Sequence, residues 1–206
     1  MPKRNQNIAK LQSGYLFPEI NRRKKAFLDR NPKAKLLSLG IGDTTEPITP
    51  NIDKALINAA AGLGTREGYT GYGDEQGMAA LREKIASVLY KGIVKGEEVF
   101  VSDGAKPDIG RLQLLFGNDA VVAVQDPAYP VYIDSTVMYG KTGRYNESGK
   151  QFENIVYMPC TPENDFFPDL KKIPRSDVIF FCSPNNPTGA VAARQQLKDL
   201  VEYARK

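Results

Sequence analysis

The sequence predicts an α/β fold with a largely parallel sheet, and the pattern of apolar segments supports this. Apolar runs without polar alternation recur at Val99–Val101, Ala120–Val124, Ile155–Tyr157 and Val178–Cys182. Segments with helical spacing separate these runs, as expected for strands that are buried on both faces and joined by helices. With 206 residues, 41% of them hydrophobic and 25% charged, the chain can form a substantial core.

The first hundred residues are predicted to be mostly helical. We expect helices from Pro18 onward, from the Thr49-Pro50 cap to about Ala61, and from about Asp74 to Tyr90. Apolar residues recur at helical spacing in the first and third of these, which predicts that those stripes face a core. One short strand is expected here, at Leu36–Leu39.

The remaining helices are predicted between the apolar runs of the second half. They cover Pro107–Phe116, a segment from about Val131 to Tyr139, and a segment from about Ala192 to the end. Helices at these places alternate with the strands, which favours parallel pairing.

Composition also limits the partners and the chemistry. The chain has no histidine, so a Ser-His or Cys-His nucleophile is excluded. Neither a metal site nor a membrane span is expected, and the cytosol is the expected location. Ten Lys and Arg residues lie in positions 1–35, but the basic run "RRKKAF" (22–27) falls on the polar side of a predicted helix, so no nucleic-acid partner is expected.

A possible phosphate site follows the first apolar run. The segment "SDGAKPD" (102–108) is a glycine-containing turn that leads into a helix, with Lys106 beside the helix start. Free backbone amides at a helix N-terminus bind phosphate groups. The spacing does not match an ATP-type P-loop, and an ordinary strand-to-helix turn is the alternative reading.

Two further turns carry groups suited to a flat ligand. In "QDPAYPVY" (125–132), prolines flank Tyr129, whose ring could present a rigid aromatic face or could cap the core. In "FCSPNNPTGA" (181–190), Asn186 could donate a side-chain N–H to a ligand oxygen or could brace the turn. Ligands of open α/β sheets bind at the carboxyl ends of the strands, where all three turns lie. A phosphate cradle, an aromatic platform and an amide donor together fit pyridoxal phosphate.

These segments resemble a known family. "SPNNPTG" resembles the signature of fold-type I pyridoxal-phosphate aminotransferases, the aspartate aminotransferase-like transferases, and "YGDEQGMAALREKIA", "SDGAKPD" and "DPAYPVY" match that superfamily in order. More narrowly, "SGYLFPEINRRKKAF", "LSLGIGDTTEPITP" and "REGYTGYGDEQG" resemble the LL-diaminopimelate aminotransferase family. The resemblance covers nearly the whole chain. It implies an N-terminal arm and the start of a small domain over residues 1–47, and the N-terminal part of a large cofactor-binding domain over 48–206.

The resemblance also implies roles for individual residues. The amides of Ala105 and Lys106 would contact the cofactor phosphate, Tyr129 would stack on the pyridine ring, and Asn186 would bind its phenolic oxygen. Tyr72 would reach the phosphate from the partner subunit of a homodimer. Substrate would contact Lys106, Tyr129 and Asn186, together with two residues of the N-terminal arm, which are Tyr15 and Gly42.

The implied reaction is transfer of an amino group between LL-2,6-diaminopimelate and 2-oxoglutarate, as in lysine and diaminopimelate biosynthesis. In this family the Schiff-base lysine follows the Asn-Pro-Thr-Gly turn, and this chain stops 17 residues after Gly189. We therefore expect no catalytic lysine here, a fold that is incomplete at its C-terminus, and no activity from these residues alone. The alternatives are another aminotransferase of the class, acting on aspartate, alanine or an aromatic amino acid, or a non-catalytic ligand-binding domain with the same fold.

Overall fold

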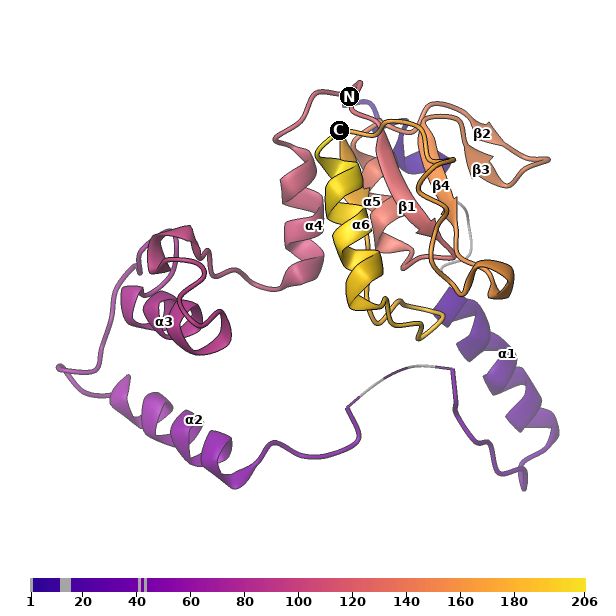
Figure 1. Ribbon diagram of the computed structural model, residues 1–206. Coiled ribbons are helices and arrows are strands. Elements are labelled where there is room, and N and C mark those ends of the chain that lie inside the picture. Colours follow the sequence, from indigo (N-terminus) through magenta and orange to yellow (C-terminus); the bar gives the residue numbers. More distant parts are fainter. Residues whose placement is uncertain (1, 12–15, 41, 43) are drawn as a thin grey trace. The chain divides into compact units, whose positions relative to one another are not determined.

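The computed structural model describes residues 2–11, 16–40, 42 and 44–206. Two compact units make up the chain (Figure 1). The sheet unit consists of Met1–Gly14 and Asp103–Lys206, and the helical unit consists of Tyr15–Ser102. The domain boundary expected after residue 47 concerns the complete fold and stays a prediction.

The sheet unit contains a parallel sheet of three strands, which confirms the predicted α/β class. The strand order is β4-β1-β5, and Val122 of β1 lies opposite Ile155 on one side and Val178 on the other. Two further strands form a short antiparallel pair that the sequence did not predict. The elements in chain order are η1 (Ile8–Lys10), α4 (Ala105–Gln113), β1 (Val122–Asp126), α5 (Val131–Met138), β2 (Tyr145–Asn146), β3 (Gln151–Phe152), β4 (Ile155–Pro159), η4 (Pro162–Asn164), β5 (Val178–Phe180) and α6 (Arg194–Ala204).

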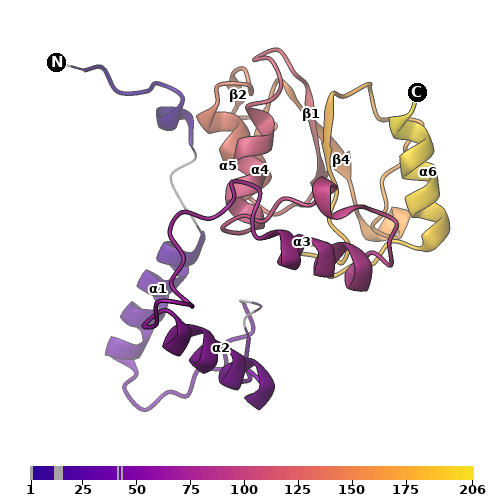
Figure 2. The same cartoon turned by 90° about the vertical axis from the view of Figure 1, so that its left-hand side faces the viewer.

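The central strand β1 is buried on both faces. Its residues Val122, Ala123, Val124 and Gln125 are all buried, although their side chains alternate between the two faces. Figure 2 shows the reason, because the sheet lies between α5 on one side and α6 on the other. The continuous apolar run in the sequence is therefore explained by helices on both faces.

An aromatic and aliphatic core forms where α5 packs on the sheet. The ring of Tyr132 stacks on Phe180 of β5, with ring centroids 4.8 Å apart and planes at 8°. Val124, Val137 and Ile155 belong to the same buried cluster. This packing fixes the position of the first turn of α5 relative to the end of β5.

Buried polar groups connect α4 to α5. Gln113 donates from Nε2 to Ser135 Oγ at 2.7 Å and accepts from Thr136 Oγ1 at 2.9 Å. The buried ammonium of Lys141 donates to the carbonyls of Gln113 and Phe116, at the end of α4. A cation at this position satisfies carbonyls that the helix itself leaves unpaired.

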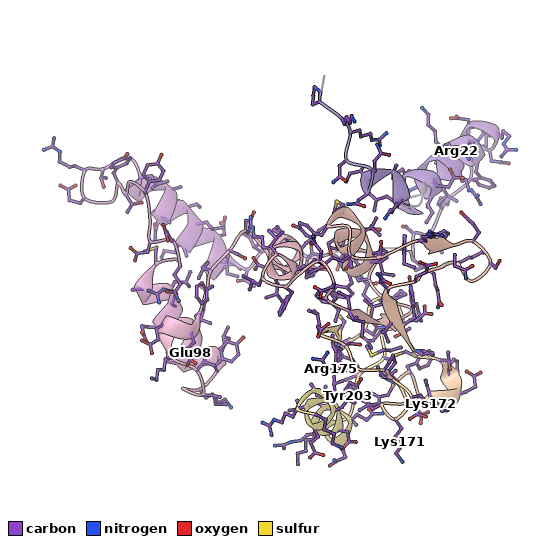
Figure 3. The ribbon with its side chains drawn as sticks, turned by 90° about the horizontal axis from the view of Figure 1, so that it is seen from above. Arg22, Glu98, Lys171, Lys172, Arg175 and Tyr203 are labelled. Atoms are coloured by element: carbon purple, nitrogen blue, oxygen red, sulfur yellow. The ribbon has the colours of Figure 1, made fainter. Side chains whose placement is uncertain are left out.

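The last helix closes the unit against the loop that precedes β5. Tyr203 of α6 donates its hydroxyl to the carbonyls of Ile173 and Pro174, at 3.2 and 2.9 Å. Figure 3 shows Tyr203 beside Arg175 of the same loop. The predicted start near Ala192 is two residues early, since α6 begins at Arg194.

The helical unit contains the helices expected in the first hundred residues. They are α1 (Leu16–Arg30), α2 (Pro50–Gly62), α3 (Ala79–Lys84), a π-helical turn η2 (Ile85–Leu89) and a 3₁₀ turn η3 (Gly96–Glu98). Pro50 begins α2 as predicted, although the Thr49 side chain makes no capping hydrogen bond there. The helix predicted from Asp74 begins later, at Ala79.

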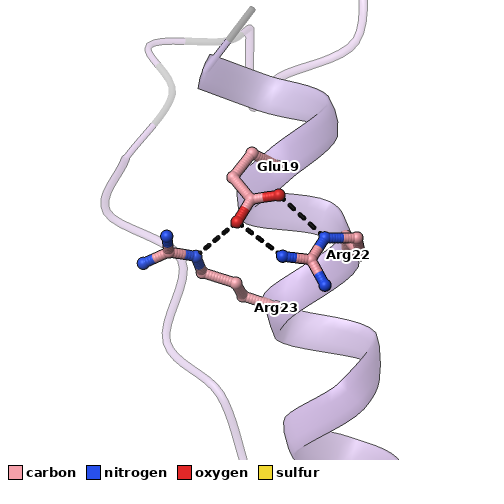
Figure 4. A network of polar contacts seen from close by, with 3 residues as sticks. All are labelled: Glu19, Arg22 and Arg23. Carbon is pink, nitrogen blue, oxygen red and sulfur yellow. Dashed lines mark hydrogen bonds and ion pairs between the residues drawn. The ribbon is translucent and has the colours of Figure 1, made fainter. Parts of the chain in front are cut away.

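Local ion pairs form along the exposed side of α1. Glu19 accepts hydrogen bonds from Arg22 and Arg23 at 2.7 to 2.8 Å, one turn along the helix (Figure 4). These two guanidinium groups lower the pKa of Glu19 to about 2. Arg22 and Arg23 are exposed, which confirms the prediction that the basic run is the solvated side of a helix.

Two predicted strands of the helical unit are wrong. Leu36–Leu39 is irregular, and the side chains of Leu37 and Leu39 are 89% and 94% exposed. Val99–Val101 is also irregular, and the Val101 N–H donates to the carbonyl of Gln76 at 3.0 Å. A strand requires a neighbouring strand for its backbone groups, and neither segment has one among the described residues.

The predicted core faces of this unit are also wrong for this chain. Apolar residues on the stripes of α1, α3 and η2 are substantially exposed; they include Ile20, Phe27, Met78, Leu81, Val88 and Leu89. The helices thus form with the expected periodicity, but most residues of these stripes stay exposed, while Leu28 and Ile85 are half-buried. Within the described residues, no helix combines the length and apolar character needed to cross a membrane.

Candidate active site

The turn before α4 places free amides at a helix N-terminus. Gly104 is the N-cap residue, with φ +125°, a backbone conformation that favours glycine. The helix begins at Ala105, two residues earlier than predicted, so the N–H groups of Ala105 and Lys106 fall in its first turn. First-turn amides have no partner inside the helix, and Pro107 contributes no N–H. The turn can therefore bind an anionic group through these two amides, the ones that the resemblance implies.

Charged side chains surround this turn. Arg111 binds Asp103 through two hydrogen bonds, which lowers the pKa of the Asp103 carboxyl. Burial raises the pKa of Asp134 on α5, and the positive charge of Lys106 opposes that rise. Lys106 therefore lies within electrostatic range of α5, which links the turn before α4 to the helix that follows Tyr129.

Tyr129 lies on the turn between β1 and α5. Its ring is half-buried and forms a T-shaped pair with Tyr132, with centroids 5.9 Å apart and planes at 87°. Its carbonyl accepts a hydrogen bond from the Tyr132 N–H at 3.2 Å, which joins the turn to α5. One part of the ring packs on the core, and the rest is accessible, so its role as a platform for a ligand stays a prediction.

The turn after β5 presents one asparagine and buries the other. Asn185 is buried, whereas Asn186 is exposed. The Asn185 backbone N–H donates to the carbonyl of Ala190 at 2.8 Å, and its carbonyl accepts from Gly189 at 2.7 Å. With the backbone closed on itself in this way, the Asn186 side chain remains available to a ligand. Asn186 makes no side-chain hydrogen bond within the described part of the chain.

The fold brings these three turns to one end of the sheet. Strands β1 and β5 are parallel neighbours, so the turns that carry Tyr129 and Asn186 leave the same edge. Figures 1 and 2 show the N-terminal ends of α4, α5 and α6 at that same end. An anion-binding turn, a partly accessible aromatic ring and an exposed amide donor thus belong to one side of one unit. A flat ligand with a phosphate group and a ring oxygen fits this donor set.

The other predicted site residues lie elsewhere in the chain. Tyr72 and Gly42 belong to the helical unit, and both are exposed. The space beside Gly42 is open, since a side chain there would meet no atom of the described residues within 4 Å. Tyr15 lies outside the described residues. The roles expected for these three residues stay predictions.

Sequence reasoning missed two buried amides beneath the site. Gln125 accepts a hydrogen bond on Oε1 from the Cys182 N–H at 2.7 Å, and Asn185 donates from Nδ2 to the Pro127 carbonyl at 3.2 Å. The adjacent asparagines of "PNNP" were the available signal, but a sequence does not show which of the two is buried. Among the described residues, no group of three or more Cys, Asp or Glu side chains is placed to hold a metal ion.

Comparison with known proteins identifies the family. The sequence model of the family "aminotransferase class I and II" matches residues 34–206. This chain belongs to the class I and II aminotransferase family. The aminotransferase-like fold expected from the sequence is thereby established, together with the α/β architecture described above.

Two curated relatives of this aminotransferase chain match almost all of it. LL-diaminopimelate aminotransferase of Protochlamydia amoebophila (strain UWE25) is 55% identical over 206 residues, which is 100% of this chain and 50% of the relative. The chloroplastic LL-diaminopimelate aminotransferase of Arabidopsis thaliana is 58% identical over 204 residues, or 98% of this chain and 44% of the relative. The chain spans about half the length of these relatives.

Solved aminotransferase structures also match this chain. L,L-diaminopimelate aminotransferase from Chlamydomonas reinhardtii matches with a TM-score of 0.89 and 58% identity, over 99% of this chain and 50% of that one. An aspartate aminotransferase from Thermus thermophilus matches with a TM-score of 0.78 and 23% identity, over 100% of this chain and 51% of that one. At that lower identity the second match supports the fold alone.

Proposed function

We propose that the full-length protein is a pyridoxal-phosphate-dependent aminotransferase that moves an amino group between LL-2,6-diaminopimelate and 2-oxoglutarate. The observation that carries the proposal is the identity of 55% to 58% across the whole chain to relatives that are named for this activity. Because the chain spans about half of those relatives, the activity is proposed for the full-length protein and not for these 206 residues alone.

The geometry supports pyridoxal phosphate as the cofactor. Ala105 and Lys106 would bind the phosphate through first-turn amides, where the helix dipole favours a negative charge. Tyr129 would stack its accessible surface on the pyridine ring. Asn186 would donate a hydrogen bond to the phenolic oxygen. These groups lie at one end of the sheet, so a single ligand of this size could contact all of them.

The residues of this chain would hold and orient the reacting groups. The cofactor supplies the electron sink for the bond broken at the substrate carbon. Tyr129 would set the plane of the ring, and Asn186 would hold its phenolic oxygen within that plane. The Lys106 side chain would add positive charge near the substrate without taking part in proton transfer.

The proposal includes a homodimer and a cytosolic location. Tyr72 is exposed in the helical unit, so its ring is available to a second subunit, where it would contact the cofactor phosphate. Tyr15 and Gly42 of the N-terminal segment would contact substrate. Light scattering of the full-length protein measures its mass. Titration of pyridoxal phosphate into the unaltered protein and into Tyr72→Phe shows whether cofactor affinity depends on the Tyr72 hydroxyl.

An amino-transfer assay tests the proposed reaction. Full-length protein loaded with pyridoxal phosphate should form glutamate from LL-2,6-diaminopimelate and 2-oxoglutarate. Aspartate, alanine and phenylalanine as amino donors should react at least about 100-fold more slowly. A faster reaction with one of these donors would assign a different substrate within the class. Cofactor binding without any amino transfer would instead favour a ligand-binding domain.

A variant tests the assigned role of Asn186. Asn186→Ala should lower turnover about 100-fold and weaken cofactor binding, because the phenolic oxygen loses its donor. Asn21→Ala on the exposed surface of α1 is a control for the substitution itself, and it should leave turnover unchanged. Equal turnover and cofactor affinity in Asn186→Ala and the unaltered protein would contradict this role.

A further inference from the structure

The pairing between β1 and β5 continues beyond the backbone ladder through side chains. The ladder ends at Val124 opposite Phe180. Just beyond the ladder, the Cys182 N–H donates to Oε1 of Gln125 at 2.7 Å, and Gln125 is only 2% exposed. A buried amide thus replaces a backbone partner where the two strands begin to separate.

Asn185 makes the next link across this gap. Its Nδ2 donates to the carbonyl of Pro127 at 3.2 Å and to Thr188 Oγ1 at 3.0 Å, and the residue is 4% exposed. A flipped amide would place an oxygen against the Pro127 carbonyl, so the orientation is determined by the network. The first bond connects two different turns, whereas the second remains within the turn after β5.

The positions of Asn185 and Pro127 in the sequence give this link its significance. Asn186 follows Asn185 directly, and Tyr129 lies two residues after Pro127. The bond therefore holds together the two backbone segments that carry the proposed amide donor and the proposed aromatic platform. A change of spacing here would move both groups relative to a ring bound between them.

We propose that Asn185 is a positioning residue of the cofactor site, which sets the spacing between Tyr129 and Asn186 without contacting the reacting atoms. The inference rests on the proposed function, because it assumes that both groups hold one cofactor. Asn185 acts through its bond to Pro127. The bond between Gln125 and Cys182 joins the same two segments closer to the strands.

The oxygen of the Asn185 amide, Oδ1, allows two substitutions at this position to be distinguished. Oδ1 is buried and has no hydrogen-bond donor among the described residues. Aspartate at this position would therefore gain no partner at Oδ1, and its second oxygen would face the Pro127 carbonyl in place of a donor. Asn185→Asp should push the two turns apart, whereas Asn185→Ala should only release them.

Asn164 provides a matched control. Its Nδ2 donates to the carbonyl of Pro159 at 2.8 Å, and its Oδ1 accepts from Thr161 N–H at 2.8 Å. The same chemistry thus braces the turn after β4, a turn that carries none of the proposed cofactor contacts. Asn164→Asp loses the same kind of amide-to-proline bond.

The experiment measures the dissociation constant of pyridoxal phosphate for the full-length protein, together with the absorbance maximum of the bound cofactor and unfolding of the cofactor-free protein in urea. We expect the dissociation constant to rise at least about 10-fold in Asn185→Asp and about 5-fold in Asn185→Ala. The absorbance maximum should shift in both variants, since stacking and the hydrogen bond to the ring oxygen change. Asn164→Asp should remain within about twofold, with no spectral shift.

Two outcomes would overturn the inference. One is equal cofactor affinity and spectrum in Asn185→Asp and Asn164→Asp. The other is a loss of cofactor-binding free energy in Asn185→Asp that equals its loss of unfolding free energy, without a spectral shift. If the unaltered protein does not bind pyridoxal phosphate, the proposed function is wrong. Crystal structures of the cofactor-free proteins then decide the positioning role, and an unchanged spacing of Tyr129 and Asn186 in Asn185→Asp overturns it.

Discussion

The two units of this chain use their apolar residues in opposite ways. In the sheet unit, residues such as Val122, Val124 and Phe180 are buried between helices and sheet. In the helical unit, Ala86 is the only buried apolar side chain among the residues that the structure describes. A fully buried Leu or Phe side chain stabilises a fold by about 1.5–3 kcal/mol. The sheet unit therefore has a core of its own, and the helical unit gains little from burial.

A groove in the helical unit shows the same difference locally. It has a volume of 460 Å³, and its apolar lining includes Ile20 and Phe27 of α1 together with Leu36, Leu37 and Leu39. Helical spacing correctly indicated which residues would share a face. The comparison teaches that periodicity identifies an apolar face but does not identify what covers it.

The largest expected effect contrasts two phenylalanines. In the 206-residue chain, Phe180→Ala should lower the free energy of unfolding by about 3–4 kcal/mol, because the ring is buried and stacks on Tyr132. Phe100→Ala should change it by less than about 0.5 kcal/mol, because Phe100 is exposed in the helical unit. Urea unfolding followed by circular dichroism measures both. Similar losses in the two variants would refute the contrast between the units.

A second pair of substitutions compares cations that bind backbone carbonyls. Lys141→Met should cost about 2–3 kcal/mol, since the carbonyls of Gln113 and Phe116 would be left unpaired in a buried setting. Arg82→Met should cost about 1 kcal/mol or less. Arg82 donates to the carbonyls of Gly77 and Gly96 at 2.9 and 2.8 Å, but it is only partly buried. The measurement is guanidinium unfolding together with amide exchange, and a larger cost for Arg82→Met would reverse the comparison.

The third prediction concerns high pH and the core of the sheet unit. Burial, followed by the adjacent Cys182 thiol, raises the pKa of Tyr132 to about 12. Below pH 10 the phenol is neutral in both folded and unfolded chains, so its contribution is complete there. Between pH 10 and 12 the unfolded phenol ionises first, and stability should fall by about 1–2 kcal/mol.

Tyr132→Phe removes the ionising group and serves as the comparison for this fall. The variant should lose less stability than the unaltered chain between pH 10 and 12, as measured by urea midpoints at each pH. Parallel pH profiles for the two proteins would show that the Tyr132 hydroxyl does not titrate as its burial implies.

The smallest expected effect is in the helical unit. Glu19→Gln removes the ion pairs with Arg22 and Arg23, but all three side chains face solvent and the pairs are screened by salt. The unfolding midpoint at 0.15 M salt should not change measurably. A large shift would mean that these exposed charges, and not burial, hold the helical unit together.

Part of the candidate site could be predicted from the sequence. Tyr129 and Asn186 were identified because proline and amide residues follow apolar runs that end at the same edge of a parallel sheet. Lys106 was identified because it lies beside a glycine-containing turn that leads into a helix. Asn185 and Gln125 were missed, because their importance depends on the gap between two strands that are more than 50 residues apart in sequence. The hairpin of β2 and β3 was also missed, since each strand has only two residues.

The sequence by itself determined the α/β class, the parallel direction of the strands and the periodic faces of most helices. Those properties depend on local geometry and on the alternation of strand and helix, which short segments encode directly. Only the tertiary structure decided which apolar faces are buried and that Leu36–Leu39 and Val99–Val101 are not strands. It also decided which asparagine of the turn after β5 links to Pro127. Burial and strand pairing need a partner surface, and a partner surface is a property of the folded chain and not of any one segment.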